Sequence, residues 1–155
     1  MKKFFFLVPF VLLLAGCPSG TNQQKAANVA KNVATFVKQA QNTEIMVFNS
    51  GQSCLVSNPD GKGCIVITQE EHVFLEQQFK AIFTLDNTLD SCIRTSTTTA
   101  GIVQCADTAV NTVDDLNSQG VLQLKSDKAR STFTSVISAV KLGIQSISTI
   151  LGGGQ

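Results

Sequence analysis

Residues 133–151 read FTSVISAVKLGIQSISTIL, and this stretch decides the fold. Its large apolar residues recur at alternating steps of four and three, which is the spacing of one face of an α-helix. Ser, Thr, Gln and Lys fill most positions between them. The pattern predicts an amphipathic helix that is capped at Ser126 or Asp127 and runs to about Leu151. The seam consists of Phe133, Ile137, Val140, Ile144, Ile147 and Leu151.

This segment also approaches the length of a membrane-spanning helix. A spanning segment needs about 20 mostly apolar residues, whereas residues 133–151 contain Lys141, Gln145 and several hydroxyl side chains. A lipid at one end of the chain and a spanning helix at the other would resemble a one-piece phage spanin. Because the apolar residues favour one face, we expect a bundle helix instead.

Three further helices are expected upstream. Apolar residues at three- and four-residue steps predict a helix from residue 25 to about 41, or on through 48. Thr68 and Glu71 form a capping-box pattern, which predicts a second helix from there to about Leu89. A third helix is expected over about 100–117, followed by a connection that begins at Ser118.

The segment between the first two helices reads CLVSNPDGKGCIVI over residues 54–67. Asn58-Pro59-Asp60-Gly61 has the residues of a type I turn, and β-prone residues flank it. The segment predicts a disulfide-closed β-hairpin, although an irregular stapled loop has a similar pattern. The expected fold class is therefore mainly α: a small bundle of about four helices with one short hairpin or loop.

Four of the five cysteines, Cys54, Cys64, Cys92 and Cys105, fall within the helical region. An even number of thiols in an exported chain favours disulfides. Pairing neighbours, Cys54 with Cys64 and Cys92 with Cys105, closes the shortest loops. A thiolate metal site is the alternative, but the spacings of ten and thirteen residues lack the close CxxC pairs of zinc sites. We expect no metal and no cofactor.

The N-terminal residues MKKFFFLVPFVLLLAG have the pattern of an export signal. Lys2 and Lys3 precede an apolar run of eleven residues, Phe4–Leu14, which suits a signal peptide better than a membrane span. If residues 1–16 are removed, the formal net charge falls from +1 to −1. This near-neutral balance offers no basic field for nucleic acid.

The run ends in Leu14-Ala15-Gly16-Cys17. This tetrapeptide resembles the lipobox of bacterial lipoproteins, in which a Leu and two small residues precede the acylated cysteine. The resemblance implies lipid attachment at Cys17 and cleavage before it. Residue 18 is Pro rather than Asp, which by Gram-negative sorting rules favours the outer membrane, facing the periplasm.

The expected organisation follows from these boundaries. Residues 1–16 form the signal peptide, and 17–24 carry the lipidated cysteine and a short polar tether. Residues 25–151 form one helical domain, and 152–155 a disordered tail. The mature chain of about 139 residues is too short for two ordinary domains.

No catalytic constellation is visible in the chain. His72 is the only imidazole, and no motif supplies it with a nucleophile and an orienting group, so we expect a solvated residue at a helix start. Asp86 interrupts an otherwise apolar stripe and, like Asp90, could pair with Arg94. The acids Asp107, Asp114 and Asp115 lack the loop geometry of a cation site. The protein is therefore not expected to be an enzyme.

The function expected is that of an outer-membrane lipoprotein that binds an envelope protein as an adaptor. Lipobox, size, helix content and disulfide use resemble the helical pilotins of secretion systems, by architecture alone. The expected partner surface is the 54–67 segment, with Leu55, Val56, Asp60 and Lys62. One alternative is a phage- or plasmid-type exclusion or immunity lipoprotein that blocks a receptor or channel. Another is a structural lipoprotein that forms homo-oligomers through the last helix.

Overall fold

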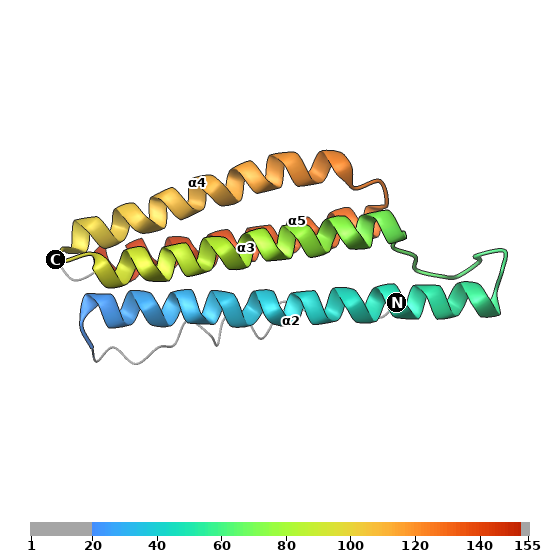
Figure 1. The fold of residues 1–155 in the computed structure, drawn as a ribbon, viewed down its shortest axis with the longest axis horizontal. Helices are drawn as coiled ribbons and strands as arrows, with labels where there is room; N and C mark the ends of the chain where they lie inside the picture. The colour runs from blue at the N-terminus through green and yellow to red at the C-terminus, as the bar shows by residue number, and fades with distance from the viewer. Residues whose placement is uncertain (1–19, 153–155) are drawn as a thin grey trace.

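The computed structural model describes residues 20–152, which form four α-helices (Figure 1). These are α2 (Asn22–Ser57), α3 (Gln69–Thr95), α4 (Thr99–Gln123) and α5 (Asp127–Gly152). Successive helices run in opposite directions and pack side by side along their length. The predicted mainly α bundle of four helices is confirmed.

Several predictions fall on residues outside this range. The signal peptide over 1–16, the acylated Cys17, the first residues of the tether, and residues 153–155 of the tail lie outside the described residues. The first helix begins at Asn22, within the segment expected to be tether.

Side-chain caps determine where the helices begin. Thr21 accepts a hydrogen bond from the backbone amide of Gln24, and the Gln24 side chain accepts one in return from the Thr21 amide. Thr68 and Glu71 form the same reciprocal arrangement at α3, so the predicted capping box is confirmed. At α5, the Ser126 hydroxyl accepts from the Ala129 amide.

The core lies along the bundle axis, where each helix buries one apolar stripe. The α2 helix packs against both α3 and α5, and α4 packs against α3 and α5. Every residue of the predicted α5 seam is at most 7% exposed. Other large core side chains come from the remaining helices and the connections between them: Val37, Ile67, Leu75, Phe79, Ile82, Ile93, Ile102 and Leu124.

Within residues 20–152, α5 is the one helix with the length and hydropathy of a membrane span. Its seam is buried against α2 and α4, whereas Leu142 and Ile150 are 60% and 38% exposed. In all, 39% of the most apolar 18-residue stretch of α5 is buried. The seam itself is not exposed in this structure for contact with a second copy.

The predicted β-hairpin does not form. The α2 helix continues through Cys54, Leu55 and Val56 to Ser57, and no strand is present in residues 20–152. The β-prone residues are helical because the apolar spacing of α2 continues through Phe48, Gly51 and Leu55, and tertiary packing overrides local propensity. The alternative, a stapled irregular loop, describes residues 58–68.

Two other helices are longer than predicted. The α3 helix ends at Thr95 rather than near Leu89, so Cys92 is helical, and α4 ends at Gln123 rather than near Asn117. The expected connection from Ser118 is wrong, since Ser118 is helical and the helix continues through Gly120, which is buried against the core. A Cβ atom there would lie 2.2 Å from Cε1 of Phe133, so only glycine lets the two helices approach this closely.

We predict that Gly120→Ala destabilises the protein by about 1–3 kcal/mol, because the added methyl overpacks against a buried ring. A Cβ at Gly152 meets nothing within 4 Å, so Gly152→Ala is the matched control. Urea unfolding followed by circular dichroism checks both. Equal midpoints for the two variants would contradict the close packing of Gly120 on Phe133.

Candidate functional site

The α2 helix continues past the start of α3 at one end of the bundle (Figure 1). With 36 residues it is about 54 Å long, whereas α3, with 27, is about 40 Å. Residues 58–68 then return along the end of α2 to reach α3. We call residues 51–67 the stapled tip, since they comprise the projecting helix end, its returning loop and the disulfide between them.

The stapled tip is held together by three kinds of contact. Cys54 and Cys64 are disulfide-bonded, as predicted, with their Cα atoms 5.7 Å apart. The Ile65 carbonyl packs directly on Gly51, where a Cβ would lie 2.5 Å from the oxygen. Short backbone hydrogen bonds turn the chain, from the Gly61 amide to the Asn58 carbonyl and from the Cys64 amide to the Gly61 carbonyl. The tip is therefore a preorganised element.

The four predicted partner-contact residues all lie on this tip, but not on a hairpin. Leu55 is half-buried against Gly61, whereas Val56 is 84% exposed. Asp60 and Lys62 are exposed, with Lys62 Nζ 3.8 Å from Asp60 Oδ2. These two are the only charged residues between positions 45 and 69.

Sequence reasoning did not include Ile65 and Leu122 as exposed apolar residues at this end of the molecule. Ile65 is 59% exposed on the returning loop, and Leu122 is 87% exposed near the end of α4. In an extended strand Ile65 and Ile67 would face the same side, so no local pattern in the sequence indicates that Ile65 is exposed and Ile67 buried. The exposure of Leu122 has no signal either, because it depends on where α4 ends.

The buried carboxylate of Glu71 joins three parts of the fold. Its Oε1 accepts hydrogen bonds from the backbone amides of Lys125 at 2.9 Å and Ser126 at 2.6 Å, and its Oε2 accepts from Thr68 at 3.1 Å. Burial alone would raise the pKa of Glu71, but the hydrogen bonds from Ser126, Thr68 and Lys125 outweigh it and lower the pKa. This carboxylate thus caps α3 and also fixes the beginning of α5.

His72 is not the solvated residue that the sequence predicted. Its Nδ1 lies 3.0 Å from Oε1 of Glu44, a fully buried carboxylate on α2, and its ring stacks on Phe48 with centroids 4.0 Å apart. Burial raises the pKa of Glu44, and the hydrogen bond and charge of His72 oppose that shift. Glu76 lies 4.0 Å from Nε2. The group connects α2 to α3 and supplies no nucleophile.

Nothing in the local sequence links Glu44 to His72, since they are 28 residues apart on different helices. The one available signal is that Glu44 falls on the apolar face of α2, at helical spacing from Val37 and Phe48. A carboxylate on such a face requires a partner when buried.

Asp86 is half-buried on the apolar stripe of α3, and its Oδ1 has no hydrogen-bond partner within the described residues. Burial, with a smaller contribution from the charge of Asp90, raises the pKa of Asp86 to about 6. Asp90, and not Asp86, pairs with Arg94, at 2.6 Å. Asp114, expected on a solvated face, pairs with Lys141 of α5 at 2.7 Å.

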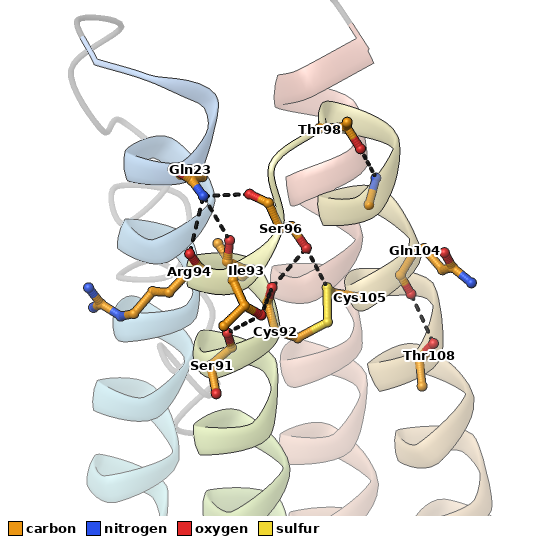
Figure 2. Close-up of a disulfide and its surroundings, with 12 residues drawn as sticks. Gln23, Ser91, Cys92, Ile93, Arg94, Ser96, Thr98, Gln104, Cys105 and Thr108 are labelled. Atoms are coloured by element: carbon orange, nitrogen blue, oxygen red, sulfur yellow. Dashed lines mark hydrogen bonds between the residues drawn. A yellow bond between two sulfur atoms is a disulfide. The ribbon is translucent and has the colours of Figure 1, made fainter.

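The second disulfide lies at the opposite end of the bundle (Figure 2). Cys92 and Cys105 are bonded as predicted and join α3 to α4. Figure 2 shows the Gln23 side-chain amide directed at the end of α3, where Nε2 donates to the carbonyls of Ile93, Arg94 and Ser96. The first turn of α2 is thereby fixed to the α3–α4 junction.

No group of three or more His, Cys, Asp or Glu side chains that could hold a metal ion occurs in residues 20–152. Comparison of the chain with protein-family models, with curated proteins and with solved structures finds no match.

We predict that Glu71→Gln lowers stability at pH 7 by about 1–3 kcal/mol, because a neutral amide replaces the charged acceptor of three backbone amides. The neighbouring Glu70→Gln, at an exposed position, should change stability little. Since the pKa of Glu71 is lowered in the folded state, its contribution is present above its ordinary value of 4.5 and is lost as pH falls through the folded pKa. Urea unfolding from pH 7 to pH 3 checks this; a Glu71→Gln variant as pH-sensitive as the parent would contradict it.

The stability of the protein should depend on the ionisation of Asp86 in the opposite direction, over a higher pH range. A carboxyl whose pKa is raised to about 6 binds a proton on folding, so stability increases as pH falls from 7 towards 5. Asp86→Asn should therefore stabilise the protein by about 1–3 kcal/mol at pH 7 and reduce this increase. Asp107→Asn, at an exposed site on α4, is the control. Thermal melts at both pH values measure the effect, and a destabilised Asp86→Asn protein would disprove the assignment.

Proposed function

We propose that the protein is a lipid-anchored adaptor of the bacterial outer membrane that binds an envelope protein through its stapled tip. The single observation that supports this is the position of the tip. It projects beyond the bundle at the end opposite the start of α2, and the lipobox Leu14–Cys17 precedes α2 in sequence. A lipid attached just ahead of α2 would leave the tip at the far end of that helix, free to contact a partner.

The chemistry of the tip suits protein contact. Val56 and Ile65 expose apolar surface, and the only two charges in residues 45–69 neutralise each other. Interface centres are depleted of charge, because desolvating an unpaired charge opposes binding. The disulfide and the Gly51 contact hold this surface in place before a partner arrives, which reduces the entropy lost on binding.

Anchoring supplies the other part of the mechanism. A lipid confines the tip to a layer next to the membrane and raises its effective concentration for a partner in the same envelope. Two or more acyl chains on Cys17 would make that attachment stable, where one chain would be marginal. The bundle needs no catalytic group for this role.

In-cell photocrosslinking tests this proposal. We predict that a photoreactive amino acid at Val56 captures one envelope protein, identified by mass spectrometry, whereas the same amino acid at the exposed Ser138 of α5 does not. Val56→Asp should reduce co-purification of the captured protein with the chain at least tenfold, since burying an unpaired charge costs more than about 1.4 kcal/mol. Far-ultraviolet circular dichroism confirms that the variant folds.

Capture of the same proteins from positions 56 and 138 would overturn the tip as the contact surface. Capture of only other copies of the chain would replace the adaptor with a self-associating structural lipoprotein. A captured receptor or channel whose activity falls when the protein is expressed would identify the chain as an exclusion lipoprotein.

A further inference from the structure

The end of the bundle opposite the tip has a rigid connection to the N-terminal segment. Thr21 caps α2 through a reciprocal hydrogen-bond pair with Gln24. In the next turn, the Asn22 side chain donates to the Thr99 hydroxyl at 2.9 Å, and Gln23 binds the last carbonyls of α3. From Thr21 onward, therefore, the chain and the α3–α4 junction form one body.

Very little chain separates this body from the cysteine of the lipobox. Four residue steps lead from Cys17 to Thr21. Even a fully extended chain covers only about 3.3–3.6 Å per residue, so the two positions lie within about 14 Å of each other. A lipid on Cys17 would therefore hold the α3–α4 end of the bundle at the membrane surface, while α2 leads about 54 Å away from it.

The surface at this end has the chemistry of a headgroup contact. Thr95, Thr97, Thr98 and Thr99 are all exposed there, and hydroxyls donate readily to phosphate oxygens. The residues nearest this end, 20–35, 91–106 and 140–152, contain no Asp or Glu. The nearest acid, Asp90, is paired with Arg94.

The charges closest to this end are Lys25, Arg94 and Asp90. Arg94 is paired with Asp90, and Lys25 follows the cap of α2, so this end has a small basic excess. A basic side chain near an anionic lipid surface contributes about 1 kcal/mol to binding. The opposite end carries charges of both signs, with Asp60 paired to Lys62 and Asp127 to Arg130.

We infer that the α3–α4 end of the bundle is a contact surface for phospholipid headgroups, on which the lipidated protein stands upright with its stapled tip in the periplasm. This inference rests on the proposed function, because it requires the lipid on Cys17. It adds to that proposal a second binding surface, a ligand class and an orientation. A partner would then contact the tip at a distance from the membrane surface of roughly the length of α2.

Tryptophan quenching tests the orientation, because the chain contains no Trp or Tyr. The full acylated protein is purified and placed in vesicles of phosphatidylethanolamine and phosphatidylglycerol that carry a headgroup nitroxide. Thr97→Trp reports on the α3–α4 end and Val56→Trp on the tip, both at exposed positions. We expect strong quenching of the first and little of the second, a several-fold difference, since nitroxides quench only at short range.

Equal quenching at both positions would overturn the inference, since it would mean that the bundle lies flat. Quenching of Leu142→Trp on α5 by a nitroxide in the acyl chains would also overturn it, because α5 would then have left the bundle and entered the bilayer. The intact mass of the purified protein separates these results from failure of the proposed function. A mass without acyl groups refutes the anchor itself, whereas an acylated protein with equal quenching refutes only the upright orientation.

Discussion

One buried carboxylate, that of Glu71, holds the beginnings of two helices together. It accepts from the amides of Thr68, Lys125 and Ser126, and so fixes the beginning of α3 beside the beginning of α5. The α4 helix joins α3 to α5 by short connections. The α2 helix continues past the start of α3, and its projecting end belongs to the stapled tip.

The two ends of the molecule are consequently built from different chemistry. At the α3–α4 end, a disulfide joins α3 to α4, and the Asn22 and Gln23 side chains join the start of α2 to the turn between them. At the other end, a second disulfide stabilises a projecting helix with exposed apolar side chains. Each disulfide closes a loop at one extremity, so neither crosses the core, and the middle of the bundle is held by the hydrophobic stripes together with the Asp114–Lys141 ion pair.

Much of this fold could be predicted from the sequence. Periodic apolar residues predicted all four helices, the Thr68–Glu71 capping box located the start of α3, and loop length predicted both disulfides. The errors lie where tertiary contact outweighs local signals. Gly120 looks like a helix stop until Phe133 is placed against it, and Leu55 looks like a strand residue until α2 is seen to continue.

The candidate site was less predictable than the fold. The sequence selected residues 54–67 as the expected partner surface, including Val56 and Asp60, and favoured a hairpin there, where the structure has a helix end followed by a loop. The buried pair of Glu44 and His72 was missed altogether, because its members come from different helices and no local pattern joins them. Contacts between buried polar side chains that are far apart in sequence depend on how the helices are aligned along one another. Apolar periodicity specifies that alignment only to within a turn.

A mechanical property follows from the continuity of α2. One unbroken helix runs from the cap at Thr21 to the tip. The helices α3 and α5 pack against its side. A pull on the tip along the bundle axis is therefore carried by the backbone hydrogen bonds of α2, while the neighbouring helices support it from the side. The described part of the molecule thus behaves as a stiff rod under an axial load.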